Sequence, residues 1–244
     1  NKLYASLLST IENLEEEKRK ASEAEQSKID FLRAASHELK TPVTALNAIL
    51  ENMILGVGKY KDRDTCLLEC REITGQLSFM IKEILDTSRL DFIQEKQDAE
   101  TFELSERLPA ICEPYQLIAK AKGLDFSFSI QGKCPVHTSK KSLEKILSNL
   151  LSNAVAYTKP GCKITVLLTA RQIKIENECT PIQPDKLAHV FEPFYRPDFA
   201  RDRKDGGNGL GLYIVDTLSK ALELPYQFVA TEDPPGMCFT LYLS

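Results

Sequence analysis

The sequence predicts an α+β protein: a hairpin of two long helices that dimerises into a four-helix bundle, followed by a two-layer α/β sandwich. Two observations carry this prediction. Apolar residues recur at steps of three and four through the first third of the chain, which is typical of long amphipathic helices. Beyond residue 101, helical stretches alternate with short stretches in which every second residue is apolar, as in strands.

The composition is that of an ordinary globular protein, with 43% hydrophobic and 27% charged residues. The formal net charge of −4 and the lack of a basic stripe argue against nucleic-acid binding. No apolar run approaches the ~18 residues that a membrane span needs, and no signal peptide opens the sequence. The odd number of cysteines, seven, favours reduced thiols that pack as small hydrophobic side chains.

Residues 1–30 are expected to form a signalling helix. Leu7, Ile11 and Leu14 have the spacing of a coiled-coil seam, but the stretch from Glu15 to Lys28 is almost wholly polar. We interpret this segment as the end of a longer rod that begins upstream of this sequence. A disordered N-terminal tail is the alternative, because an isolated polar helix lacks an apolar face to pack.

Residues 31–93 are expected to form the dimerising hairpin. Its first helix carries a seam of Leu32, Ala35, Leu39, Pro42, Leu46, Ile49 and Met53. Glycines and charges in 56–62 break this helix, and a second helix follows with a seam of Leu67, Cys70, Ile73, Leu77, Met80 and Ile84. Further apolar residues stay uncovered in a single hairpin: Val43, Leu50, Ile54, Ile81 and Leu85. Two hairpins would bury them in a four-helix bundle, so we expect a homodimer.

Residues 94–101 are polar and are interpreted as a linker to a second domain, 102–244. In that domain the patterns predict helices over 104–120, 142–157 and 210–222. They predict strands over 124–130, 163–170, 172–177, 225–230 and 238–243. Mixed strands with helices on one face give the two-layer sandwich.

His37 is the first candidate for chemistry. Its neighbours one turn away are mostly polar, so it faces solvent from a rigid helix rather than the seam, where a structural histidine usually packs. The segment 31–42, with His37-Glu38-Leu39-Lys40-Thr41-Pro42, resembles the phosphoacceptor box of bacterial sensor histidine kinases. The resemblance implies that His37 accepts the γ-phosphate of ATP and that Glu38 is a base or orienting group. It also implies that Thr41 orients water for dephosphorylation of the partner, while Pro42 is expected to kink or loosen the helix.

Asn149 and Asn153 lie four residues apart on one face of a predicted helix, and amide oxygens suit Mg²⁺. The segment 149–158 resembles the Asn box of the kinase ATPase domain. That resemblance implies that Asn153 is the Mg²⁺ ligand, that Asn149 supports the metal or phosphate, and that Tyr157 packs near the nucleotide. Ala156 departs from the family, which commonly has Lys or Arg there for a phosphate contact.

Two further segments resemble the borders of the family's ATP lid. Phe191-Glu192-Pro193-Phe194-Tyr195-Arg196 resembles the Phe box, in which the forked donors of Arg196 suit a γ-phosphate contact. The segment 206–212 resembles the second glycine box, so Gly207, Gly209 and Gly211 are expected to let backbone N–H groups approach phosphates. It matches neither a P-loop nor a dinucleotide fingerprint. Weaker lid candidates are Arg201, Arg203 and Lys204.

The adenine end is the least regular part. The family usually has Asp-x-Gly-x-Gly, whose Asp accepts a hydrogen bond from the adenine amino group. Here Asn177-Glu178-Cys179-Thr180-Pro181 stands at that spacing, so both glycines are replaced. We expect Asn177 to recognise adenine through its amide oxygen, with somewhat weaker ATP affinity.

The resemblance as a whole implies a Bergerat-type ATPase domain, Mg·ATP as phosphate donor, and transfer to an aspartate of a response-regulator receiver domain. The segment 34–42 and the irregular adenine loop resemble those of some vancomycin-resistance sensor kinases. The resemblance also implies a protein on the cytoplasmic side of the cell membrane, attached through a missing N-terminal part. A related ATPase that does mechanical work or phosphorylates serine is disfavoured by the hairpin with its His37 motif. A non-catalytic dimeric scaffold with a degenerate ATP site stays open, although Asn149, Asn153 and the glycines oppose it.

Overall fold

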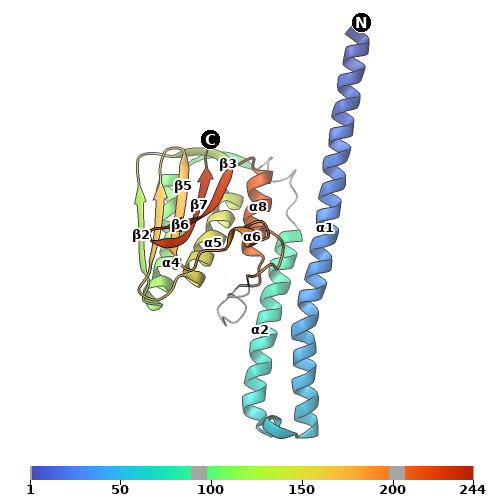
Figure 1. Ribbon diagram of the computed structural model, residues 1–244, viewed down its shortest axis with the longest axis vertical. Coiled ribbons are helices and arrows are strands. Elements are labelled where there is room, and N and C mark those ends of the chain that lie inside the picture. Colours follow the sequence, from blue (N-terminus) through green and yellow to red (C-terminus); the bar gives the residue numbers. More distant parts are fainter. Residues whose placement is uncertain (1, 89–97, 198–206, 244) are drawn as a thin grey trace. The chain divides into compact units, whose positions relative to one another are not determined.

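The computed structural model describes residues 2–88, 98–197 and 207–243. The chain divides into two compact units, Asn1–Ser88 and Arg89–Ser244. The first is a helical hairpin and the second an α/β sandwich, so the predicted α+β class is confirmed (Figure 1). No helix of the described residues combines the length and hydropathy that a membrane span requires.

The hairpin consists of α1 (Lys2–Leu55), the short 3₁₀ helix η1 (Gly58–Lys61) and α2 (Arg63–Ser88). Gly56 and Gly58 have φ of 63° and 53°, a left-handed conformation that ends a helix and that glycine adopts without strain. The predicted break is therefore confirmed. Helix α1 runs from Lys2 across residue 30, so the alternative of a disordered tail is wrong, and Pro42 lies within this helix.

The turn end of the hairpin holds a small core. Ile49, Cys66 and Cys70 are buried there, and four partly buried side chains pack against them: Leu46, Met53, Tyr60 and Ile73. Two seam assignments were wrong, because Leu32 and Leu67 are 46% and 54% exposed. Cys66 takes the seam position in place of Leu67, and from it the steps to 70, 73, 77, 80 and 84 alternate strictly between four and three.

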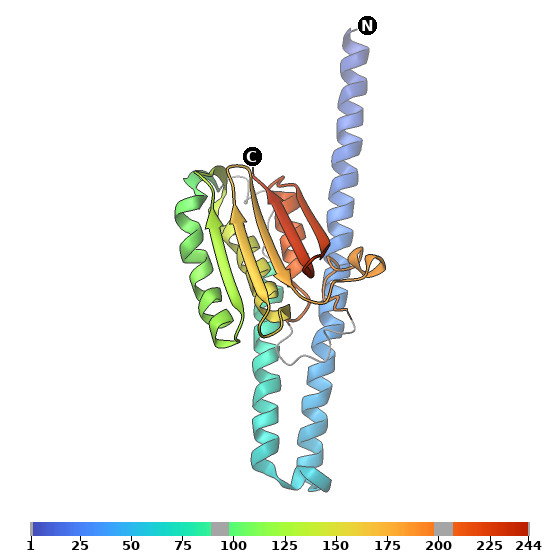
Figure 2. The same cartoon turned by 60° about the vertical axis from the view of Figure 1, so that its left-hand side comes forward.

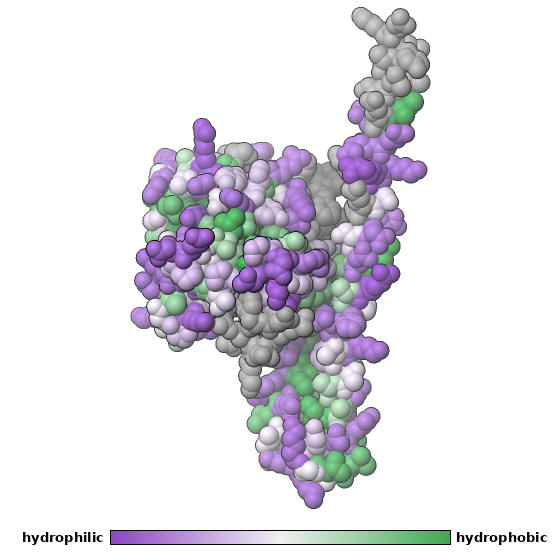
Figure 3. Space-filling model, viewed as in Figure 1, coloured by the Kyte–Doolittle hydropathy of each residue, from purple (hydrophilic) through white to green (hydrophobic). Residues whose placement is uncertain are grey.

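Apolar side chains also lie on the outside of the hairpin. All five that were expected to stay uncovered are exposed, from 40% at Leu50 to 80% at Ile54. Figure 3 shows apolar side chains gathered on the hairpin around its turn. A solvated helix pair does not normally present this much apolar surface, which is typical of a face that another chain covers.

The second unit is built on a five-stranded sheet in the order β2-β4-β5-β7-β6. The strands are β2 (Asp125–Ile130), β4 (Lys163–Leu168), β5 (Gln172–Glu178), β6 (Tyr226–Glu232) and β7 (Pro235–Tyr242). Only β2 and β4 pair in parallel; the other pairs are antiparallel. The helices α4 (Leu104–Ala121), α5 (Lys140–Tyr157) and α8 (Gly211–Ala221) cover one face of the sheet, which confirms the two-layer sandwich (Figures 1 and 2).

A two-stranded ladder of β1 (Ala99–Glu103) and β3 (Pro135–Ser139) precedes α5, and the sequence patterns did not predict it. Its first strand begins inside the polar stretch 94–101 that was interpreted as a linker. Ala-Glu-Thr-Phe-Glu offers one large apolar residue, so the strand depends on its pairing with β3 rather than on its own pattern. The one-turn helix α6 (Pro184–Leu187) was also not predicted.

The core lies between the sheet and the helix layer. Its largest fully buried side chains come from all three helices and from β4 and β5, and they include Leu108, Leu147, Ile164, Ile173 and Ile214.

All seven cysteines are free thiols, five of them buried, as expected of small hydrophobic residues. Burial raises the pKa of the Cys112 thiol to about 12, so this thiol stays protonated and unreactive.

Candidate active site

His37 lies on α1 with 80% of its side chain exposed. Its Nδ1 is 3.6 Å from the Oε1 of Glu38, which is longer than a hydrogen bond but within the range of an ion pair. Thr41 is exposed one turn later. The imidazole is therefore open to a reactant, with a carboxylate beside Nδ1 and the opposite nitrogen, Nε2, available for attack.

The two carboxamides of α5 meet the start of α8. The Nδ2 of Asn149 donates to the Lys145 carbonyl (2.8 Å), so its Oδ1 points away from its own helix. A Cβ built on Gly211 would lie 3.4 Å from this Oδ1 and 3.3 Å from both amide atoms of Asn153. The absent side chain at Gly211 thus allows the N-terminus of α8 to approach both amides. Backbone N–H groups and amide oxygens gathered in this way suit phosphate and a hard cation.

Gly209 and Phe194 form a close backbone contact that joins the Phe-box segment to the glycine segment. The Phe194 N–H donates to the Gly209 carbonyl (3.0 Å), and both residues have positive φ, 64° at Phe194 and 77° at Gly209. A Cβ on Gly209 would lie 2.6 Å from the Phe194 carbonyl carbon, a distance that real side chains do not reach. Only glycine fits here, because the left-handed conformation and the close approach both exclude a side chain.

Gly209→Ala is accordingly expected to lower the free energy of unfolding by about 2 kcal/mol and to weaken ATP binding at least tenfold, because the Phe194 contact must open. Urea unfolding and calorimetric titration with Mg·ATP measure the two effects. Gly207→Ala is the matched control for stability, since a Cβ at Gly207 meets no described atom within 4 Å. Equal stability of the two variants would contradict the importance of the contact.

Asn177 lies near the end of β5 and belongs to a short chain of hydrogen bonds. Its Nδ2 donates to the Thr158 hydroxyl (3.2 Å), and that hydroxyl donates to the Ala154 carbonyl (2.7 Å). Thr158 follows α5 directly and is 5% exposed. The structure thus brings the predicted adenine residue to the end of the helix that carries Asn149 and Asn153.

The loop after Asn177 is tied to the neighbouring strand β7. The Cys179 N–H donates to the Pro235 carbonyl (3.2 Å), and the Ile182 N–H contacts the Met237 sulfur at 3.4 Å. A Cβ on Gly236 would overlap the Asn177 carbonyl oxygen, so β7 also passes close to the backbone at this point. These contacts hold the loop after Asn177 against β7.

Three further site candidates lie close in sequence to these groups. Tyr157 is half-buried at the end of α5, Arg196 is half-buried two residues after Phe194, and Gly207 is exposed. Their positions agree with the borders of a nucleotide site, and their roles stay predictions. The weaker candidates Arg201, Arg203 and Lys204 lie outside the described residues.

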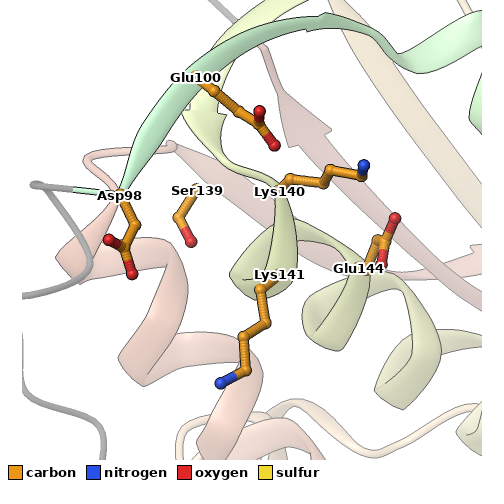
Figure 4. Close-up of a pocket in the computed structure, with 6 residues that line it drawn as sticks. All are labelled: Asp98, Glu100, Ser139, Lys140, Lys141 and Glu144. Carbon is orange, nitrogen blue, oxygen red and sulfur yellow. The ribbon is translucent and has the colours of Figure 1, made fainter.

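A separate hollow of about 270 Å³ lies at the N-terminal end of α5. Its lining consists of Asp98, Glu100, Ser139, Lys140, Lys141 and Glu144. Figure 4 shows the Lys140 side chain between those of Glu100 and Glu144. Three carboxylates outnumber two lysines, so the hollow does not suit a triphosphate, and none of the predicted nucleotide residues lines it.

No cluster of three or more His, Cys, Asp or Glu side chains that could hold a metal is found in the described ranges 2–88, 98–197 and 207–243. The oxygen donors near Gly211 suit Mg²⁺ better than a transition metal, because Mg²⁺ keeps several waters and takes its other ligands from phosphates. Asn153 is the residue that would hold it, and the bound ion would neutralise charge on the phosphates.

Two residues of this site were missed by the sequence reasoning. Thr158 carries no motif of its own, although its place directly after the Asn-box helix could have indicated it. Phe194 was noted only as part of its box, and a positive φ at an aromatic residue has no sequence signal. The other two histidines, His137 and His189, bond to Thr101 and Glu192, at 2.9 and 2.7 Å.

The fold is shared with solved histidine kinases. It matches the Acinetobacter baumannii histidine kinase AdeS with a TM-score of 0.63 and 23% identity, over 85% of this chain and 97% of that one. It also matches the histidine kinase ThkA, solved in complex with the response regulator protein TrrA, with a TM-score of 0.66 and 17% identity. That match covers 93% of this chain and 65% of the other.

Sequence relatives cover the whole chain. It is 32% identical over 243 residues to the sensor histidine protein kinase HK06 of Streptococcus pneumoniae, and 34% identical over 245 residues to the sensor protein VanSB of Enterococcus faecalis. These alignments take in 100% and 99% of this chain but 54% of each relative. The chain therefore spans about half the length of the curated relatives it matches.

Both parts of the chain match protein families. Residues 27–92 match the His Kinase A (phospho-acceptor) domain, and residues 138–244 match the family described as Histidine kinase-, DNA gyrase B-, and HSP90-like ATPase. The first contains His37 and the second contains the amides, Asn177 and the glycines. With these two domains in this order and these relatives along its whole length, the chain belongs to the ATP-dependent sensor histidine kinases of two-component systems.

Proposed function

We propose that the chain transfers the γ-phosphate of Mg·ATP to Nε2 of His37 and passes it on to an aspartate of a response-regulator receiver domain. The observation that carries this proposal is the pairing of an exposed imidazole, open on its Nε2 side, with a separate unit whose amides and glycines suit a triphosphate. The relative ThkA, solved with a response regulator protein, supports the choice of partner.

The phosphoryl transfer proceeds as a displacement at the γ-phosphorus. The Nε2 lone pair of His37 forms the new P–N bond while the bond from the γ-phosphorus to the bridging oxygen breaks, and ADP leaves with that electron pair. The proton on Nδ1 then passes to Glu38 or to water. Glu38 lies 3.6 Å from Nδ1, and we expect this distance to shorten in the reacting complex.

The nucleotide lies between the end of α5 and the start of α8. Asn153 would hold Mg²⁺ and Asn149 would support the metal or a phosphate, while Tyr157 would pack near the base and Asn177 would recognise adenine. Arg196 contacts the γ-phosphate and takes over part of the charge neutralisation that Ala156 does not supply. Backbone N–H groups at Gly207, Gly209 and Gly211 approach the phosphates.

Thr41 is proposed to orient water when the protein removes phosphate from its partner. The residue is exposed on the same side of α1 as His37, one turn away, so one docked receiver domain can meet both side chains.

The alternative to the kinase is a non-catalytic dimeric scaffold, which Ala156 and the irregular adenine loop favour.

Nucleotide binding separates these two functions. We expect Mg·ATP to bind the purified chain with a dissociation constant in the micromolar range. We expect EDTA to weaken binding at least tenfold, because Asn153 would hold Mg²⁺ and the ion would neutralise charge on the phosphates. Isothermal titration with ATP, with and without Mg²⁺, measures both. The absence of any ATP binding would favour the scaffold.

The homodimer is proposed to bury the exposed apolar face of the hairpin in a four-helix bundle. Leu50→Lys is expected to raise the dimer dissociation constant at least a hundredfold, because each copy would bury an unpaired charge. Sedimentation velocity gives the association state. The matched control is Ala48→Lys, which places the same charge about 200° round the helix at another exposed position. Loss of the dimer in both variants, or in neither, would contradict the assigned face.

A further inference from the structure

The hydrogen bonds around Asn177 determine which way round its side-chain amide lies. The Ala154 carbonyl accepts two hydrogen bonds from Thr158, one from its N–H (3.1 Å) and one from its hydroxyl (2.7 Å). The hydroxyl has a single proton, which it gives to Ala154, so toward Asn177 it can only accept. The amide must therefore turn its NH₂ toward Thr158, as observed at 3.2 Å.

The other end of this amide is its acceptor. Within the part of the chain that the structure describes, no protein group donates to the Asn177 Oδ1, and the residue is half-buried. The backbone of Asn177 is held in β5 by both neighbouring strands, opposite Ile164 and Met237. Rotation of the side-chain amide is thus the remaining freedom at this position.

We infer that Thr158 is a positioning residue that selects the purine base: it fixes the Asn177 amide so that Oδ1 accepts a hydrogen bond from a 6-amino group. The inference rests on the proposed function, in which Asn177 meets adenine. It adds that the selection is limited, because an amide that turns over offers its NH₂ to a 6-oxo group instead.

The limit follows from one hydrogen bond. When the amide turns over, the Thr158 hydroxyl must swing its proton from Ala154 to the Asn177 oxygen, and the Asn177–Thr158 bond survives with its direction reversed. The bond from Thr158 hydroxyl to Ala154 is lost, while Ala154 keeps the bond from the Thr158 N–H. The net value of one hydrogen bond corresponds to about fivefold in a dissociation constant, so a 6-oxopurine nucleotide is disfavoured by about that factor.

A carboxylate at this position would behave differently. An aspartate accepts in both orientations and never donates, so it would repel a 6-oxo group whichever way it turned. Asn177→Asp is therefore expected to raise the discrimination to at least fiftyfold, with ATP affinity equal to or above that of the wild type. The asparagine makes this site more permissive than an aspartate would.

The test is the ratio of dissociation constants for ITP and ATP, measured with Mg²⁺ on the whole chain by fluorescence competition. ITP carries oxygen in place of the 6-amino group and lacks the 2-amino group of GTP. It also differs at N1, but that difference is the same for every variant, so the change in the ratio between variants reports position 6. We expect a ratio of about five for the wild type and for Thr158→Ser, and of at most two for Thr158→Val.

The outcomes separate the inference from the proposed function. A Thr158→Val ratio equal to that of the wild type, with a ratio that does respond to Asn177→Asp, would overturn the role of Thr158 and leave Asn177 as the base-reading residue. If Asn177→Ala instead leaves both the ATP affinity and the ITP/ATP ratio unchanged, Asn177 does not contact the base, and the proposed nucleotide site is wrong. If Thr158→Val fails to fold, Thr158→Ser supplies the test, because serine keeps the hydroxyl. An ITP/ATP ratio for Thr158→Ser that is far from the wild-type ratio would then overturn the inference.

Discussion

His37→Gln is expected to lower the incorporation of labelled phosphate from Mg·ATP into the chain by a factor of at least a thousand. Glutamine keeps a polar side chain of similar length and favours helix as well as histidine does, so α1 should persist. Its amide nitrogen has no basic lone pair and cannot form the P–N bond. Because His37 is exposed and makes no buried contact, the free energy of unfolding should change by less than about 0.5 kcal/mol.

The measurement is a time course of phosphate incorporation, with nucleotide affinity determined on the same preparation. Affinity for ATP should match that of the wild type, because the amides and glycines of the nucleotide site lie in the second unit. Arg33→Gln is a suitable control: Arg33 is exposed one turn before His37 and has only a weak ion pair with Asp30 at 3.4 Å. Its labelling should stay within about threefold of the wild type.

Asn153→Ala is expected to lower kcat/KM for autophosphorylation by about a thousandfold, which corresponds to about 4 kcal/mol of transition-state stabilisation. The substitution removes the amide oxygen proposed to hold Mg²⁺. It also leaves a gap beside Gly211, because both amide atoms of Asn153 lie 3.3 Å from the position that a Cβ on Gly211 would take. Phosphoryl transfer relies on charge neutralisation and alignment, so loss of a metal ligand affects the rate more than a single nucleotide contact would.

Initial rates across a range of Mg²⁺ concentrations test this prediction. A lost metal ligand predicts that the variant requires more Mg²⁺ and recovers part of its rate when the metal is in excess. Ser152→Ala is the matched control, because Ser152 is the preceding residue of α5 and is exposed. A rate for Asn153→Ala within threefold of the Ser152→Ala rate would remove Asn153 from the site.

Much of the fold could be predicted because its elements carry strong local patterns. The hairpin helices follow from steps of three and four, and the break after α1 follows from Gly56 and Gly58. Strands β1 and β3 could not be predicted in this way, since each depends on the other for its pairing. Cys66 was passed over in favour of Leu67 because a leucine is the more obvious core residue, although the strict alternation of steps indicates Cys66.

The candidate site, too, has parts that local sequence patterns predict and parts that depend on tertiary contacts. Helix periodicity placed Asn149 and Asn153 on one face of α5, and the resemblance to the kinase family assigned Gly211 to the same site; the structure brings the three residues together. The contact between Gly209 and Phe194, and the bond between Asn177 and Thr158, join residues 15 and 19 positions apart through tertiary packing. No local pattern encodes such contacts, so they require the structure.

The chemical stability of the phosphorylated wild-type chain tests most directly whether the chain phosphorylates itself on a histidine. The purified chain is labelled from Mg·[γ-³²P]ATP, divided, and held in acid or in alkali before the retained label is counted. A phosphoramidate on His37 predicts label that is lost in acid and kept in alkali. Label that survives acid would place the phosphate on a hydroxyl side chain and contradict the account.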